Sequence, residues 1–114
     1  MTRDEAREHF KKCGLDYSVL TTSNVERLRD LLKLELKQSG CIHGTFRGNH
    51  RYKTYDSGCV ELTCRADYFS RRETVTFNPD GYIGFAGWAS VVNVEPVIAA
   101  FVKWCDELAK ELTQ

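Results

Sequence analysis

The amino-acid sequence predicts an α+β fold, namely a two-layer sandwich in which an antiparallel meander of four to five strands is covered on one face by helices. Two periodicities support this prediction. Apolar residues recur every three or four positions up to residue 40 and again after residue 93, as in amphipathic helices. From about residue 41 to 87 they recur at every second position, as in half-buried strands. A sheet with one apolar face must bury it, and the helices can cover it. The expected order is ααββββ(β)α, within a single domain over residues 1–114.

The first helix is expected to begin after Thr2 and to end at Gly14. Thr2 and Glu5 have the spacing of a capping box, in which each side chain bonds the backbone of the other residue. Gly14 supplies the residue with positive φ that often terminates a helix, and Leu15 would then fold back on the last turn. The apolar stripe of this helix consists of Ala6, Phe10 and Cys13.

A second helix is predicted from a second capping box, Ser23 with Glu26, and would end at Gly40. Its apolar residues have the three-four spacing of an amphipathic helix, so the cap and the period agree. These apolar residues are Val25, Leu28, Leu31, Leu32 and Leu36.

The strands are predicted from five segments that alternate apolar and polar residues: "HGTFR", "HRYKTY", "CVELTCRA", "ETVTF" and "YIGFAG". Gly48 and Asn49 would form a tight turn between the first two. An antiparallel meander of this kind leaves one polar face. The residues expected to face inward in the two middle segments are Val60, Leu62, Cys64, Ala66, Val75 and Phe77.

The stretch 77–90, "FNPDGYIGFAGWAS", contains three glycines spaced three apart. A dinucleotide-binding loop needs G-x-G-x-x-G between a strand and a helix, and neither the spacing nor the position fits here. "NPDG" instead predicts a hairpin turn, with Pro79 and Asp80 at its centre and Gly81 in the left-handed conformation. Gly84 lies in the return strand, where it would either admit a closely packed helix or leave a flat surface for a partner.

The last helix is expected over residues 94–112. Asn93 would cap it, and Pro96 would lie in its first turn, where a missing N–H is tolerated. The stripe expected to be buried consists of Val97, Ile98, Phe101, Trp104, Cys105, Leu108 and Leu112.

The composition excludes several functional classes. Sixteen basic residues balance sixteen acidic ones, so no net field draws the chain to nucleic acid or to a membrane. No apolar run approaches the roughly 20 residues of a membrane helix, and the charged segment "MTRDEAREHF" lacks the apolar core of a signal peptide. The five cysteines, an odd number, indicate free thiols in a reducing compartment. We therefore expect a cytoplasmic protein with no membrane partner.

Cys41, His43, Cys59 and Cys64 have the right side chains for zinc, but their spacing differs from the two tight pairs of ribbons and fingers. Cys59 and Cys64 are also an odd number of residues apart in a predicted strand, so they would point to opposite faces. No cysteine lies in a recognisable nucleophile motif, and His9, among charged residues, is expected to be a solvated surface residue. The sequence predicts no cofactor, metal site or catalytic residue, with a thiol- or zinc-dependent protein as an alternative.

Basic and aromatic residues gather in "FRGNHRYKTY" and "YFSRRE". Aromatic residues and arginine are frequent anchors of protein interfaces, and the same side chains can hold phosphates and stack bases. We predict a non-enzymatic protein-binding function, with nucleic-acid binding as the alternative and homodimerisation through an open sheet edge as a further option. The predicted contact surface is the outward sheet face and hairpin edge: Arg51, Tyr52, Arg71, Arg72, Tyr82 and Trp88.

The segment "YFSRRETVTFNPDGYIGFAGWASVVNVEPVIAAFVKWCDEL" resembles small accessory proteins of tailed phages and prophages. The resemblance covers the C-terminal third to half of the chain. It lies in the run "RRE-x-VTFN-x-DG-x-IGFAGWA", followed by "NVEP" and a helix. It implies a bacterial host cell and an accessory role, such as modulating or inhibiting a host enzyme or a defence protein. That family has no established activity, so the resemblance implies no catalytic residues.

Overall fold

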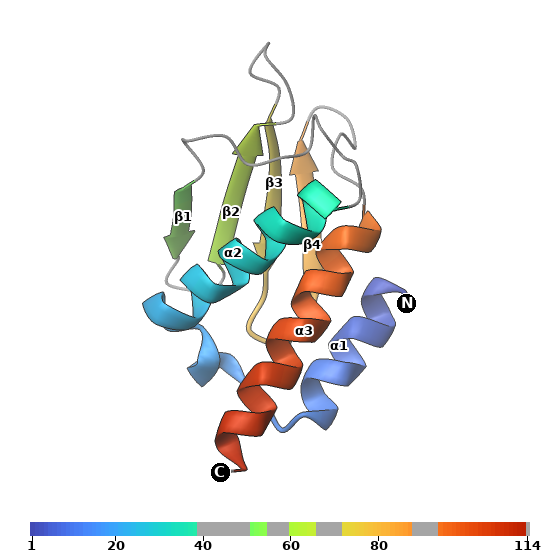
Figure 1. Cartoon of the computed structure of the whole chain (residues 1–114), viewed down its shortest axis with the longest axis vertical. Coiled ribbons are helices and arrows are strands. Elements are labelled where there is room, and N and C mark those ends of the chain that lie inside the picture. The colour runs from blue at the N-terminus through green and yellow to red at the C-terminus, as the bar shows by residue number, and fades with distance from the viewer. Residues whose placement is uncertain (39–50, 55–59, 66–71, 88–93, 114) are drawn as a thin grey trace.

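The computed structural model describes residues 1–38, 51–54, 60–65, 72–87 and 94–113, with side-chain environments over 1–35, 75–84 and 95–113. Helix α3 lies between α1 and α2, and the strands lie behind the three helices (Figure 1). The elements in chain order are α1 (Arg3–Lys12), the 3₁₀ turn η1 (Tyr17–Val19), α2 (Thr22–Gln38), β1 (Arg51–Thr54), β2 (Val60–Arg65), β3 (Arg72–Phe77), β4 (Ile83–Gly87) and α3 (Val94–Leu112).

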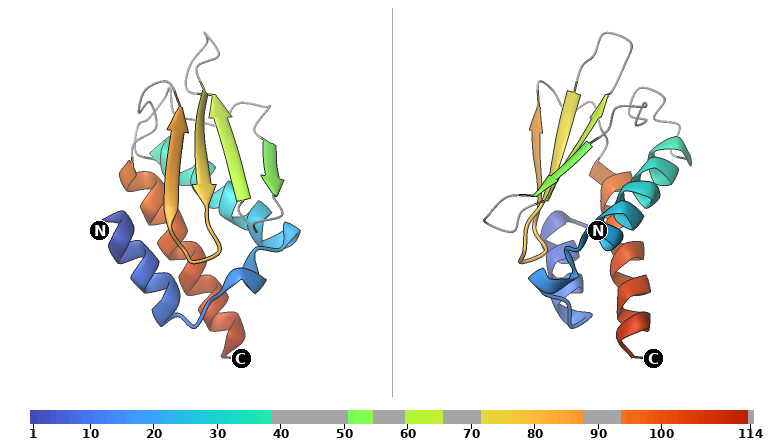
Figure 2. Two further views of the ribbon diagram at one scale, coloured as in Figure 1. Left: turned by 180° about the vertical axis from the view of Figure 1, so that it is seen from behind. Right: turned by 90° about the vertical axis from the view of Figure 1, so that its left-hand side faces the viewer.

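The described strands pair antiparallel in the order β1-β2-β3-β4. One cross-strand row contains Tyr52, Leu62, Val75 and Phe85, and the side chain of Val75 is fully buried. Successive positions of a strand point to opposite faces, so the rows on either side of this one belong to the other face. The helices lie on one side of the strands, as the back and side views of Figure 2 show.

The structure corrects the predicted two-layer sandwich built on a four- to five-stranded meander. The helices contain 10, 17 and 19 residues and the strands four to six, so the described chain is mainly helical. Among the described side chains, the strand residues of the core all come from the two-stranded β3–β4 hairpin: Val75, Phe77 and Ile83. Alternation predicts a strand but not its length, and the described strands are short beside the helices. The predicted strand "HGTFR" lies outside the described residues.

Among the described side chains, the core centres on α3. The ring of Phe101 stacks on Phe10 of α1 and on Phe77 of β3, with centroids 5.9 and 5.7 Å away, and packs against Trp104 at 5.7 Å. Trp104 is fully buried, and its indole N–H donates to the carbonyl of Asn24 in α2 over 2.8 Å. Leu112, predicted to be buried, is 62% exposed because the last turn of α3 extends beyond the other elements (Figure 1).

The predicted start and end of the first helix are confirmed. The backbone N–H of Glu5 donates to the Thr2 hydroxyl, and the Thr2 N–H donates to the Glu5 carboxylate. Gly14 has a φ of 75°, and the buried Leu15 donates its N–H back to the carbonyl of Phe10. These contacts turn the chain at the end of α1 and keep the helix against α3.

The predicted cap of the second helix is wrong by two residues. Helix α2 begins at Thr22, and the Thr21 hydroxyl accepts the N–H of Asn24. Four consecutive residues, from 21 to 24, are good caps, so sequence alone does not select among them. The side-chain amide of Asn24 donates to the carbonyl of Val19 instead, which fixes η1 against the start of α2.

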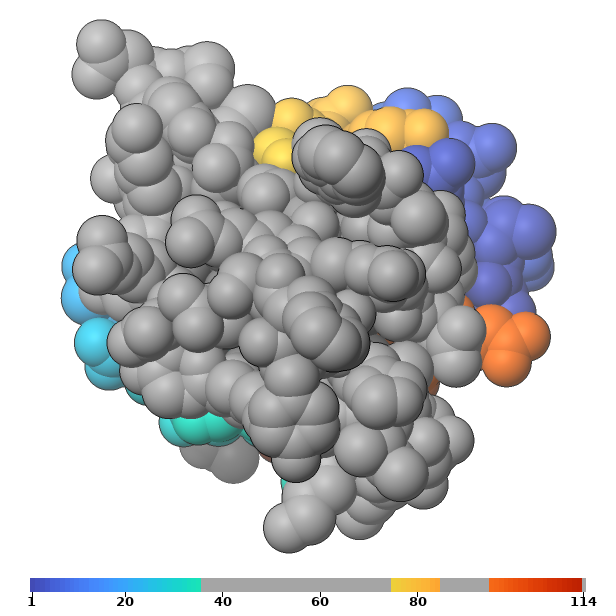
Figure 3. Space-filling view, turned by 90° about the horizontal axis from the view of Figure 1, so that it is seen from above, coloured from blue at the N-terminus to red at the C-terminus, as the bar shows by residue number. Residues whose placement is uncertain are grey.

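The predicted hairpin turn is confirmed. The backbone N–H of Asn78 donates to the carbonyl of Tyr82, and the carbonyl of Asn78 accepts the N–H of Gly81. The Asp80 carboxylate accepts the N–H of Tyr82, and Gly81 has a φ of 90°. A Cβ at Gly81 would lie 2.6 Å from the ring of Phe10, so glycine is needed for space as well as for backbone conformation. Seen from above, this hairpin lies beside the N-terminal part of α1 (Figure 3).

Candidate functional site

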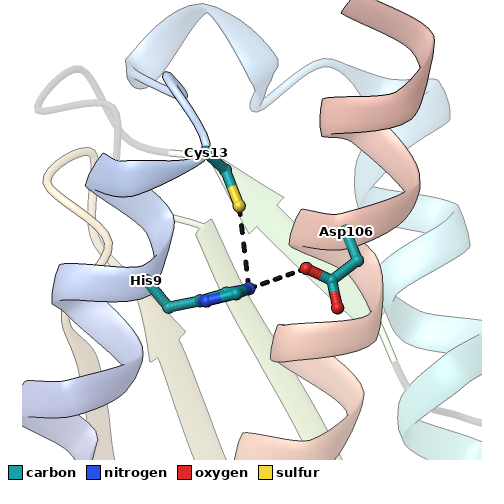
Figure 4. Close-up of side chains that lie close together, drawn as sticks. All are labelled: His9, Cys13 and Asp106. Atoms are coloured by element: carbon teal, nitrogen blue, oxygen red, sulfur yellow. Dashed lines mark hydrogen bonds and ion pairs between the residues drawn. The ribbon is translucent and has the colours of Figure 1, made fainter.

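Three potential metal ligands meet between α1 and α3: the imidazole of His9, the thiol of Cys13 and the carboxylate of Asp106 (Figure 4). The Nε2 atom of His9 lies 2.7 Å from Oδ1 of Asp106 and 3.6 Å from Sγ of Cys13. All three ligand atoms lie within 4.8 Å of one another. Within the side chains that the structure describes, this is the one group of three such residues.

The positions of His9 and Cys13 follow from the local sequence. They are four residues apart, so they lie on the same face of α1, one turn from each other. Cys13 is the C-terminal cap of the helix and still has helical backbone angles, with its N–H bonded to the carbonyl of His9. The stacking of Phe10 on Phe101 holds this end of α1 against α3, which presents Asp106.

The prediction that His9 is merely a solvated surface residue is wrong. Its side chain is 28% exposed and contacts Asp106, which is 97 positions away in the sequence. The only local signal was the four-residue spacing to Cys13, which also fits an ordinary helix. The pairing with Asp106 is long-range, so no local sequence pattern predicted it.

A single nitrogen of His9 is close to two partners. If Nε2 carries a proton, it donates to Asp106 and cannot accept a hydrogen bond from Cys13. If Nε2 is unprotonated, it can accept a hydrogen bond from the thiol. Its lone pair then lies 2.7 Å from a lone pair of the Asp106 carboxylate oxygen, and the two repel each other. A proton on Nε2 therefore satisfies Asp106, and the Cys13 sulfur is then only a weak second acceptor of the same N–H.

The thiols of Cys13 and Cys105 are both held in the protonated form. Burial raises the pKa of Cys13, and the nearby carboxylate of Asp106 raises it further. Burial also raises the pKa of Cys105, with Cys13 and Asp106 adding to the effect. A cysteine nucleophile needs a thiolate, which a lowered pKa supplies. Neither thiol has that property, so the cluster does not have the electrostatics of a cysteine-dependent enzyme.

The His9 side of the cluster opens to solvent. His9 lines a surface depression of about 360 Å³ together with residues from the start of α1. Three of the other lining residues, Asp4, Glu5 and Glu8, are acidic, and one, Lys12, is basic. The depression therefore has an excess of negative charge beside the imidazole.

The structure does not place the predicted contact residues in one cluster. Arg51 and Tyr52 are neighbours in β1, and Arg72 is the first residue of β3. Tyr52 occupies the cross-strand row of the buried Val75, whereas Arg51 is in the adjacent row with Thr63 and Thr74. Arg71 and Trp88 lie outside the described residues.

Tyr82 lies at the opposite end of the hairpin from Arg72. It follows the turn, and its ring is covered by two arginines of α1: the guanidinium carbons of Arg3 and Arg7 each lie 5.5 Å from the ring centroid. The Arg3 side chain also donates to the carbonyl of Ile83. Tyr82 therefore helps to hold α1 to the hairpin, a role that the sequence analysis did not foresee.

The register reveals a pair of arginines that the sequence analysis did not single out. Arg65 of β2 is directly opposite Arg72 of β3. By contrast, Lys53 of β1 is opposite Glu61 of β2, a pair of opposite charge. The alternation of apolar and polar residues predicts that Arg65 is on the outward face, but only the strand register identifies Arg72 as its partner.

Gly84 does not need to be glycine for close helix packing. A Cβ at this position would meet only Thr76 of the neighbouring strand, at an ordinary contact distance of 3.7 Å. Among the described atoms, no helix comes within 4 Å of it. Of the two alternatives for Gly84, the one that needs a packed helix is therefore excluded within the described structure.

The other cysteines and His43 are not placed together by the structure. Cys41, His43 and Cys59 lie outside the described residues, and Cys64 is known only by its position in β2, opposite Glu73. Within the described part of the chain, no helix has the length and apolar character needed to cross a membrane.

Comparison of the chain with protein-family models, with curated proteins and with solved structures gave no match. The resemblance to phage and prophage accessory proteins stays a prediction. The functional argument therefore rests on the geometry described above.

Proposed function

We propose that this chain is a non-enzymatic binding protein that holds an acidic partner protein on the sheet face directed away from the helices. The observation that carries the proposal is the direct pairing of Arg65 with Arg72. Like charges in directly opposite positions of a sheet are destabilising. A carboxylate of a partner, bound between these positions, would turn that repulsion into two favourable interactions.

The neighbouring positions support a partner of the same kind. Arg51 occupies the same set of alternate rows, two strands away from Arg72, and adds a further positive charge. Lys53 and Glu61 pair with each other on this face, and the other positions of these rows hold small residues, so a partner can approach the strand backbones closely there. The small residues are Thr63, Thr74, Thr76, Gly84 and Ala86.

In the bacterial setting that the phage resemblance implies, the partner would be a host enzyme or a defence protein. Binding would modulate or inhibit that protein, and the chain itself would need no catalytic residue. This role agrees with the high pKa of the thiols of Cys13 and Cys105, which makes them poor nucleophiles.

The test compares a charge reversal on the sheet face with one on the helices. The double variant Arg51→Glu/Arg72→Glu changes the proposed surface, and Lys33→Glu/Lys110→Glu makes the same change in charge at exposed positions of α2 and α3. Proteins captured from a nuclease-treated bacterial lysate are identified by mass spectrometry, and each is then purified and titrated against the three proteins. We expect one acidic protein that binds the sheet-face variant at least about 10-fold more weakly, or 1.4 kcal/mol, and binds the helix variant unchanged.

Nucleic acid is the competing ligand, and the same proteins test it. Labelled single-stranded and duplex DNA are titrated at rising salt, because phosphate contacts weaken steeply as salt increases. Salt-sensitive DNA binding that Arg51→Glu/Arg72→Glu abolishes, without any captured protein partner, would replace this proposal with nucleic-acid binding. Equal loss of the protein partner in both double variants would contradict the assignment to the sheet face.

A further inference from the structure

We propose that His9, Cys13 and Asp106 bind one zinc ion between α1 and α3. The inference is independent of the proposed protein-binding face, which lies on the sheet. Its basis is a set of one nitrogen, one sulfur and one oxygen ligand within 4.8 Å of one another. Imidazole, thiolate and carboxylate are the three protein ligands that zinc uses.

Two of the three distances between ligand atoms are close to those of a tetrahedral zinc site, and the third, from Cys13 to Asp106, is at most 4.8 Å and has to close to roughly 3.6 Å. Zinc bonds of about 2.0–2.3 Å place neighbouring ligand atoms roughly 3.2–3.6 Å apart. The distance from Nε2 of His9 to Sγ of Cys13 is already 3.6 Å. The distance from Nε2 to Oδ1 of Asp106 is 2.7 Å and must lengthen by about half an ångström. Because Asp106 is 53% exposed, a small rotation of its carboxylate provides that movement.

Zinc would also hold all three side chains at once. One proton on Nε2 of His9 bonds Asp106 strongly and the Cys13 sulfur only weakly, whereas one cation lying among the three atoms attracts all of them. On binding, the Cys13 thiol releases its proton to solvent, and the imidazole keeps its proton on Nδ1 so that the Nε2 lone pair faces the ion. The three protein ligands then carry two negative charges, which balance the charge of Zn²⁺.

The surroundings permit entry of the ion. His9 borders the depression that contains the carboxylates of Asp4, Glu5 and Glu8, and these raise the local concentration of cations. The fourth ligand position would hold a water molecule, since only three protein ligands meet here. Such an arrangement, three protein ligands and one exchangeable position, differs from a closed structural zinc site with four protein ligands.

The mixture of donors selects zinc over the common hard cations. Magnesium and calcium prefer oxygen ligands throughout, and one carboxylate would be insufficient for either. The thiolate and imidazole instead favour a borderline-soft ion. Bound zinc would join α1 to α3, so it should stabilise the fold in proportion to its affinity and concentration.

The experiment is a zinc titration of the full chain, kept reduced, against a chromophoric chelator. We expect one equivalent of zinc for the wild type and an increase in melting temperature with zinc. Cys13→Ser and Asp106→Asn should each weaken binding at least about 100-fold, the upper end of what loss of a supporting partner does to metal affinity. Substitution with Co²⁺ should give a thiolate-to-cobalt charge-transfer band that Cys13→Ser removes.

Two control variants test whether other thiols of the chain bind the zinc instead. Cys105→Ala removes the buried neighbouring thiol, and Cys41→Ser/Cys59→Ser removes two of the thiols considered in the sequence analysis; both should keep the wild-type affinity. Circular dichroism checks that every variant is folded. His9→Gln should weaken zinc binding in the same way, and if it fails to fold, Cys13→Ser and Asp106→Asn still test the site. Absence of a stoichiometric site in the wild type, or loss of zinc only in Cys41→Ser/Cys59→Ser, would overturn the proposal.

Discussion

Helix α3 is bound by two helices in different ways. Its contact with α2 joins permanently charged groups of opposite sign: Arg27 pairs with Glu107 at 3.2 Å and with Glu111 at 2.8 Å, and Lys103 pairs with Glu35. Its contact with α1 has stacked phenylalanines and a single polar cluster of three side chains.

This difference distinguishes polar side chains that stabilise a contact between helices from polar side chains that can also bind a ligand. In the contact with α2 these charged groups have partners of opposite charge, and the indole of Trp104 has the carbonyl of Asn24. Stabilisation of the contact accounts for them. At α1 the polar groups are an imidazole, a thiol and a carboxylate around one nitrogen, which are also ligands that zinc uses.

The largest expected effect concerns the apolar part of the α2–α3 contact. Trp104→Ala removes a fully buried side chain and should lower the free energy of unfolding by about 3–5 kcal/mol. Trp104→Phe keeps most of the ring contacts but loses the indole hydrogen bond to the Asn24 carbonyl, which still accepts a hydrogen bond within α2, so it should cost about 0.5–1.5 kcal/mol. Urea unfolding measures both. A loss in Trp104→Phe as large as in Trp104→Ala would mean that the hydrogen bond, rather than packing, dominates this contact.

The attachment of α1 to the hairpin can be broken at Gly81. Gly81→Ala forces a residue with a side chain into a φ of 90° and places its Cβ 2.6 Å from Phe10, so we expect a loss of about 2–4 kcal/mol. Gly14→Ala is the matched control, because its φ is 75° but nothing lies within 4 Å of the added carbon. It should cost only the backbone strain, about 1–2 kcal/mol. Equal losses in thermal unfolding would show that the contact with Phe10 is unimportant.

The ion pairs of α2 should contribute less than either of these changes. Arg27→Met keeps the apolar stem of the side chain but removes its charge. Because Arg27 and its two glutamates are partly exposed, we expect a loss of roughly 0.2–1 kcal/mol for each pair, and less at high salt. Unfolding of the variant and the wild type at low and high salt checks this. A difference that does not change with salt would argue against an electrostatic origin.

The smallest expected effect is a pH dependence of stability at the start of α1 that the start of α2 lacks. The Thr2 backbone N–H, and then the Thr2 hydroxyl, hold the pKa of the Glu5 carboxyl below its ordinary value of 4.5. The ionised form is therefore favoured in the folded state. The resulting stabilisation is fully present above about pH 4.5 and is lost as the pH falls through the lower folded pKa.

The variant Glu5→Gln tests this pH dependence. It should remove this part of the acid dependence, which unfolding measurements between neutral and acid pH would detect. Helix α2 provides the contrast, since its cap is the hydroxyl of Thr21 and its first turn contains no acidic residue. A Glu5 carboxyl that titrates at its ordinary pKa in an NMR experiment would refute the prediction.

The sequence predicted well those features that depend on neighbouring residues. The hairpin turn at Pro79, Asp80 and Gly81 and the capping box at Thr2 involve groups within four positions of each other, and backbone sterics select them almost alone. The cap at Ser23 was predicted wrongly because Thr21 is an equally good cap, and the tertiary position of η1 decides between them.

The features that sequence could not predict depend on distant residues. His9 and Asp106 are 97 positions apart, and nothing local to either residue indicates the other. The pairing of Arg65 with Arg72 needs the strand register. The excess of helix over strand in the described residues depends on the lengths of the elements, which alternation does not predict. Thus the local turns and caps were predictable, whereas the candidate zinc site and the arginine pair were not.

The central position of Phe101 has a consequence for synthesis on the ribosome. Helix α3 leaves the ribosome after all the other described elements, so Phe10 and Phe77 have no aromatic partner until it emerges. Until then the nascent chain exposes the apolar faces of the earlier elements, and such surfaces are prone to aggregate. Folding should also be comparatively slow, because Phe101 contacts residues that lie far from it in the sequence.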